Sequence, residues 1–151
     1  MANLETAVYT AQTAAADNAG SFIDTAELIS GKVSYLQAHW VAPAGTGVGD
    51  NVFLAYVPSG MTLIPHLSSV FVNDSNAGVS ADLYLGDPDN GGTEVIAEID
   101  ISTPGTFLLN SSSSNLCSIK ATERTAIAIQ ISAAVTAADE FCFNFLLVNS
   151  N

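Results

Sequence analysis

The sequence predicts an all-β fold, an antiparallel jelly-roll-like β-sandwich with an extended N-terminal arm. Three observations support this prediction. From residue 32 onward, apolar residues recur at every second position, and turn-forming residues interrupt them about every ten residues. The last two apolar stretches show this alternation most clearly, with Phe at every second position of the final one. No stretch has the pattern of a long helix.

The N-terminal part differs from the rest, so we divide the chain into an arm with its lead-in (residues 1–30) and a sandwich domain (residues 31–151). Residues 4–19 are rich in Ala and Thr, and their larger apolar groups are mainly Leu4, Val8 and Tyr9. Such a segment buries little surface on its own, so it is either a mobile arm or a strand that needs a partner. We therefore expect residues 1–20 to act in assembly more than in folding. Residues 24–29 are compatible with one helical turn.

Eight or nine strands are predicted in the domain, separated by stretches rich in Gly, Pro, Asn, Asp and Ser. The predicted strands and short apolar pieces are residues 33–41, 51–57, 67–72, 79–85, 95–101, 106–109, 126–131 and 141–148. In residues 95–101, Glu98 and Asp100 are expected to face outward. The side chains expected in the core are Leu83, Ile127, Ile129, Ile131, Phe141, Phe143 and Phe145.

Composition excludes several classes of protein. The chain has 151 residues, which fits one domain, with 15 acidic and 3 basic side chains and a formal net charge of −12. Three bases cannot neutralise a run of phosphates or hold an anionic membrane, so we expect no nucleic-acid or membrane partner. No signal peptide and no membrane span are apparent.

The sequence contains no recognisable catalytic centre. His39 and His66 are the only histidines, no GxSxG motif is present, and both histidines are expected to be structural. Cys117 and Cys142 lack the spacing of a metal or redox motif, so we interpret them as reduced, buried small residues, with a disulfide as the alternative. We predict that the protein is not an enzyme and has no catalytic residue, no cofactor and no metal site.

Two loops resemble ligand-binding motifs. Gly45, Gly47 and Gly49 suggest a phosphate loop, but a strand follows them instead of a helix and no Lys is present, so we predict an ordinary connection. Residues 87–98 place Asp at positions 1 and 3, Gly at 6 and Glu at 12, as in an EF-hand calcium loop. Position 5 is Gly91, position 8 is Glu94, and the flanks are predicted strands. The preferred interpretation is a hairpin loop, and an occasional hard-cation site at Asp87, Asp89 and Glu94 is the alternative.

Four aromatic residues allow two interpretations. Trp40, Tyr35, Tyr56 and Tyr84 lie in predicted strands, where aromatic side chains commonly pack in a core or an interface. Together on one face of the sandwich they would instead form a platform for binding sugars.

Several stretches resemble small structural proteins of tailed bacteriophages. They are the Ala/Thr-rich start that leads into SFIDTAELISGKVSYLQAHWV, the central SADLYLGDPDNGG, and the closing TAIAIQISAAVTAADEFCFNFLLV. Together they look most like the capsid decoration, or cement, proteins, which have an N-terminal arm and a β-sandwich body. The likeness covers most of the chain as a pattern of strands, and no individual functional residue can be carried over.

This resemblance implies a virion protein that binds the outer surface of the capsid, with the major capsid protein as its partner and a homotrimer as its usual form. It implies that the protein bridges neighbouring shell subunits, and that the arm pairs with the open sheet edge of a neighbour. The alternative is a module of a phage tail or fibre that binds host glycans through Trp40 and the tyrosines.

Overall fold

The structure is a computed structural model that describes residues 3–6, 9–10, 33–73, 80–109, 118–132 and 139–149. Two sequence predictions fall outside these residues, the helical turn at 24–29 and the environment of Cys117. Among the described residues, no helix is long and apolar enough to cross a membrane.

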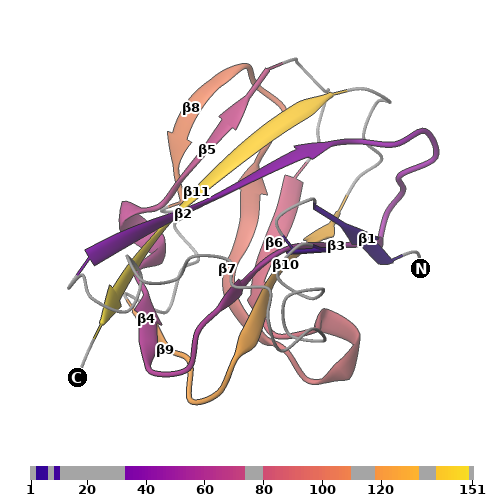
Figure 1. Cartoon of the computed structure of the whole chain (residues 1–151). Helices are drawn as coiled ribbons and strands as arrows, with labels where there is room; N and C mark the ends of the chain where they lie inside the picture. The colour runs from indigo at the N-terminus through magenta and orange to yellow at the C-terminus, as the bar shows by residue number, and fades with distance from the viewer. Residues whose placement is uncertain are drawn as a thin grey trace.

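One sheet, called here the β3 sheet, has five strands in the order β1-β3-β10-β6-β7 (Figure 1). Every pairing within it is antiparallel except the one between β1 and β3, which is parallel. The bounds of its strands are β1 Asn3–Glu5, β3 Asn51–Val57, β6 Ser80–Leu85, β7 Thr93–Asp100 and β10 Thr125–Ile131. A short 3-10 helix, η2 (Pro88–Asn90), lies between β6 and β7 in the sequence.

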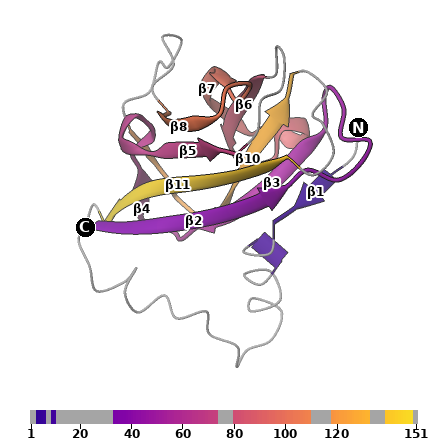
Figure 2. The same ribbon diagram turned by 90° about the horizontal axis from the view of Figure 1, so that it is seen from above.

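The other sheet, called here the β11 sheet, is organised around its longest strand, β11 (Glu140–Asn149). Along one edge β11 pairs with β2, and along the other it pairs first with β5 and then with β4. Figure 2 shows β2, β11 and β5 as neighbouring bands. The remaining bounds are β2 Val33–Val41, β4 Met61–Leu63, η1 Pro65–Leu67, β5 Ser69–Val72, β8 Gly105–Leu108 and β9 Ile119–Lys120.

The two sheets form the predicted all-β sandwich. The eight longer strands run in the orders β8-β5-β11-β2 and β3-β10-β6-β7, which is a jelly-roll-like arrangement. Successive side chains of a strand point to opposite faces, so each sheet contributes one row of apolar side chains per strand to the core. All seven residues predicted in the core are buried, and Phe141, Phe143 and Phe145 are 0% exposed.

The structure differs from the sequence prediction where strands are short. The stretch predicted as one strand over residues 67–72 begins with the end of η1, and β5 starts only at Ser69. β4 and β9 were not predicted, because two or three residues are too few to show an alternating pattern. Where β11 changes its partner from β5 to β4, the buried Ser68 hydroxyl fills the gap by accepting a hydrogen bond from Leu146 N at 2.9 Å.

Candidate protein-binding surface

The outer face of the β11 sheet carries a contiguous set of uncharged side chains, bordered on the same face by His39 of β2 and Glu140 of β11. The strand register aligns Cys142 of β11 with Phe71 of β5, and Phe71 with Thr106 of β8. In the next row, the Gln37 amide donates a hydrogen bond of 2.9 Å to Asn144 Oδ1 across β2 and β11. We call this surface the neutral face, and it consists of Tyr35, Gln37, Ser69, Phe71, Thr106, Leu108, Cys142 and Asn144.

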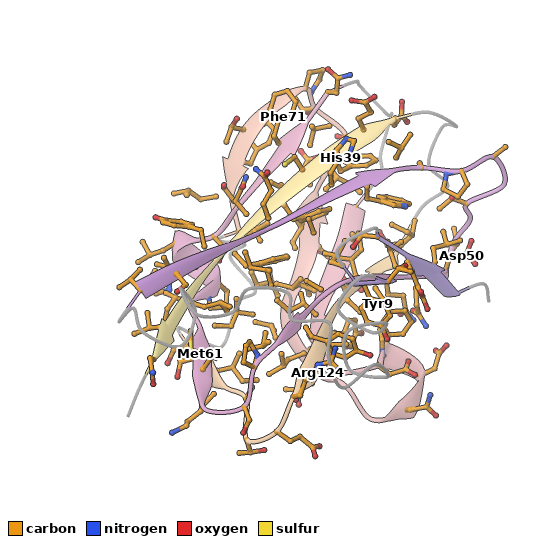
Figure 3. The ribbon with its side chains drawn as sticks, viewed as in Figure 1. Tyr9, His39, Asp50, Met61, Phe71 and Arg124 are labelled. Atoms are coloured by element: carbon orange, nitrogen blue, oxygen red, sulfur yellow. The ribbon has the colours of Figure 1, made fainter. Side chains whose placement is uncertain are left out.

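Large apolar groups on the neutral face are open to solvent. Tyr35 is 71% exposed, Leu108 is 55% exposed and Phe71 is 43% exposed. Single exposed apolar residues are ordinary on a protein surface, but several on one sheet face are typical of an interaction site. Figure 3 shows Phe71 and His39 over this sheet, with His39 next to the neutral face on β2.

The neutral face contrasts with the outer face of β6 and β7 in the β3 sheet. Asp82, Glu94, Glu98 and Asp100 project there, and we call this surface the acidic face. Hydrogen bonds from the Ser102 hydroxyl and backbone N–H hold the pKa of Asp100 below its usual value. Beside the neutral face, by contrast, the residues that the structure describes place one carboxylate, that of Glu140, whose Oε2 lies 3.8 Å from His39 Nε2. The molecule therefore has two sheet faces of very different charge.

The two histidines lie apart, and both are exposed. His39 is on the outer side of β2, and His66 is exposed in η1. Cys142 is half-buried, whereas the sequence prediction had it buried. This prediction was wrong because the even-numbered side of β11 at Cys142 points outward while Phe141 and Phe143 point into the core. Cys142 forms no disulfide, and partial burial raises the pKa of its thiol, which keeps it uncharged.

The glycine-rich connection between β2 and β3 is a compact loop that leads into a strand, as predicted. Gly45 and Gly49 have φ angles of 89° and 83°, in the left-handed region that glycine adopts without strain. The buried Asp50 carboxylate closes the loop by accepting a hydrogen bond from Gly47 N at 2.9 Å. The loop therefore has an internal partner for its amide instead of an open anion cradle.

The calcium-like stretch folds as a turn followed by a strand. Asp87 accepts hydrogen bonds from Asp89 N at 3.0 Å and from the Asn90 amide, which caps η2. Asp89 accepts a hydrogen bond of 2.7 Å from the Asn51 side chain, which in turn accepts one of 3.0 Å from Gln130. Glu94 lies in β7, where Tyr84 OH donates to it at 3.3 Å. Within the described ranges, no three His, Cys, Asp or Glu side chains are grouped so that they could hold a metal ion.

We predict that calcium is not needed for folding. The two aspartates at the start of the loop are already bound to amides of the protein, and a cation would have to displace these bonds. Thermal melts with excess calcium and with a chelator should agree within about 2 °C, because a ligand stabilises a fold only if it binds the native state. A clear drop in the melting temperature with the chelator would contradict this prediction.

The four aromatic residues proposed for a sugar platform do not come together. Trp40 is 4% exposed and stacks on Phe141 in the core, with 5.2 Å between ring centroids. Tyr35 belongs to the neutral face, whereas Tyr56 and Tyr84 lie on the outer side of the β3 sheet. Trp40 is therefore a core residue, and the interpretation of these four residues as one sugar-binding platform is wrong.

The start of the chain covers part of the outer side of the β3 sheet. β1 pairs with β3, and Thr6 continues this contact by donating from its N–H to Phe53 O at 2.8 Å and from its hydroxyl to Leu54 O. Tyr9 lies over Phe53 and Tyr56, with centroid distances of 5.1 and 4.6 Å, and Figure 3 shows it beside β3. Burial, helped by a 2.8 Å hydrogen bond with Tyr56 OH, raises the Tyr9 pKa.

Sequence reasoning missed this contact, although it named Tyr9 among the apolar groups of the arm. The sequence prediction allowed a strand that needs a partner, and the structure places that partner in the same chain for residues 3–6. The available signal was the position of Phe53 and Tyr56 in β3, which project to the outer side of the sheet and need a cover. The division of the chain at residue 30 stays a prediction, since residues 11–32 are not described.

No protein-family model matches the sequence, and no curated protein matches it. The structure is similar to a chain in the capsid of Ralstonia phage GP4, with a TM-score of 0.64 and 15% sequence identity over 99% of both chains. Two further matches have TM-scores below 0.5. A chain in the Cyanophage Pam1 capsid asymmetric unit has a TM-score of 0.49 and 18% sequence identity, over 78% of this chain and 85% of that one. A chain in the acidic stable capsid of Helicobacter pylori bacteriophage KHP30 has a TM-score of 0.47 and 15% sequence identity, over 78% of this chain and 88% of that one. At these identities, the first likeness shows a shared fold.

Proposed function

We propose that this chain is a structural protein of a bacteriophage particle that binds the outer surface of the capsid and bridges neighbouring capsid subunits. The observation that carries the proposal is the likeness to the Ralstonia phage GP4 capsid chain, which extends over 99% of both chains. A likeness that covers nearly all of both chains is a more specific match than one limited to a common sandwich core. The sequence resemblance to decoration proteins supports the same role independently.

The charge distribution suits such a role. A net charge of −12 and the acidic face keep separate copies apart and soluble before assembly. The neutral face offers a surface that can meet a partner without burying carboxylates. Because many copies would repeat one modest interface on a particle, weak individual contacts are sufficient for stable attachment. In this proposal the partner is the major capsid protein, the protein is not an enzyme, and its oligomeric form is a homotrimer.

Binding to capsids assembled without this chain tests the proposal. Purified protein should co-sediment with such capsids, saturate at a fixed ratio to the capsid subunit, and raise the temperature at which the shells disrupt. Absence of co-sedimentation at micromolar concentrations, together with binding to a panel of host glycans, would contradict the capsid role and favour a tail or fibre module.

A further inference from the structure

We propose that the neutral face is the surface by which the protein attaches, and that it binds an apolar, uncharged surface of a capsid subunit. This inference rests on the proposed function and adds which face binds and the chemistry of what it binds. Eight side chains on four neighbouring strands, β2, β11, β5 and β8, form this surface.

The first argument is charge. The chain has 15 acidic residues, yet the outward side chains of β2, β5, β8 and β11 include one carboxylate, Glu140, which borders the neutral face, while four carboxylates project from the acidic face. Burying an unpaired carboxylate in an interface costs several kcal/mol, so a surface that becomes buried is expected to lack carboxylates. The difference between the two sheets indicates that the acidic face stays in solvent and the neutral face is covered.

The second argument is the kind of side chain exposed. Tyr35, which is 71% exposed, offers a large ring with few rotatable bonds, the type of residue that dominates the energy of many interfaces. Phe71 and Leu108 add apolar area on β5 and β8, and the amides of Gln37 and Asn144 lie on the neighbouring strands β2 and β11. Interfaces with an apolar centre and a few polar groups have this composition.

The third argument is rigidity. The neutral face is part of a sheet whose strands pair along their length, and its opposite side rests on the fully buried Phe141, Phe143 and Phe145. The bond between Gln37 and Asn144 fixes two of its polar side chains. A preorganised surface loses little conformational entropy on binding, which favours affinity.

Net charge decides between a capsid subunit and a second copy of this chain as the partner. Two copies that met through their neutral faces would bring two bodies of charge −12 together, and this repulsion opposes the contact. We therefore assign the face to a capsid subunit, the partner in the proposed function. A face that binds the capsid is not free for contacts between copies, so the proposed homotrimer is expected to use contacts outside the neutral face.

The test introduces carboxylates into the neutral face. Tyr35→Glu and Leu108→Glu, alone and combined, are compared with Val48→Glu in co-sedimentation with capsids that lack the chain. Val48 is a matched control because it is apolar, 68% exposed and located in the loop between β2 and β3. Thermal melts and light scattering of each variant report folding and oligomeric state. Tyr35→Ser, which adds no charge, provides a second variant should a carboxylate disturb the fold.

The double variant should bind capsids about tenfold more weakly or worse, and Val48→Glu within about twofold of the original protein, with the same melting temperature and oligomeric state for all. Binding of the double variant equal to that of the original protein would overturn the inference and leave the proposed function intact. A changed oligomeric state would also overturn it, because the neutral face would then be an interface between copies. Failure of the original protein to bind capsids would instead refute the proposed function.

Discussion

Truncation of Phe143 to Ala should lower the free energy of unfolding by about 3–5 kcal/mol, the usual cost of removing a large side chain from a core. Phe143 is 0% exposed, and its ring stacks near that of Phe145 with 6.1 Å between centroids. It lies in the middle of β11, between β2 and β5, where the sheet is held on both edges. The surrounding strands therefore cannot close the cavity left by the missing ring.

Urea unfolding of the purified protein measures this effect, with Phe71→Ala as a matched control. Phe71 is 43% exposed and pairs with Cys142, one position before Phe143, so the control changes the same residue type on the opposite face of the same sheet. Phe71→Ala should cost about 1 kcal/mol or less, as for most surface substitutions. Equal costs for the two variants would contradict the assignment of faces in β11.

Sequence alternation predicted the faces of the long strands because their two sides have different surroundings. In β11, the side chains of Phe141, Phe143 and Phe145 face the core, and those of Cys142 and Asn144 face outward. The two sides of the strand therefore differ clearly in polarity. The same parity argument places Trp40 in the core, because it shares its side of β2 with Leu36 and Ala38. The sugar-platform interpretation is wrong for Trp40 because the alternation along β2 turns its side chain into the core.

The candidate surface could not be predicted from the sequence in the same way. Its members are uncharged, but Gln37 and Asn144 are separated by 107 residues, and they become neighbours only because β2 and β11 pair. The strand order, which brings β5 and β8 next to β11, depends on contacts across the whole chain. The partner change along β11 at Ser68 is similarly nonlocal, since it joins residues 78 apart.

Removal of residues 1–10 should leave a folded, cooperatively melting domain that is less stable by about 2–4 kcal/mol. The deletion removes two aromatic contacts of Tyr9, worth about 0.5–1.5 kcal/mol each. It also removes hydrogen bonds of Thr6 and Tyr9, worth about 1 kcal/mol each. Part of this loss is offset because the shorter chain no longer loses the conformational entropy of ordering these residues. It also uncovers Phe53, which is 6% exposed in the intact chain. The main core between the sheets loses the contact of the partly buried Leu4 and keeps its other members, since Phe53 belongs to a separate small cluster with Ala126 and Ala128.

A matched pair of tyrosine substitutions shows whether the segment is docked on β3 in solution. Tyr9→Ala should cost about 1–3 kcal/mol because it loses both ring contacts and the hydrogen bond with Tyr56, whereas the 71% exposed Tyr35→Ala should cost about 0.5 kcal/mol or less. Urea unfolding measures the stability of both variants. Ultraviolet titration of the tyrosines should lack, in Tyr9→Ala, the step that belongs to Tyr9 with its raised pKa. If Tyr9→Ala and the deletion leave stability unchanged, this part of the arm acts in assembly more than in folding, as the sequence predicted for residues 1–20. If the deletion unfolds the domain, β1 belongs to the folding core.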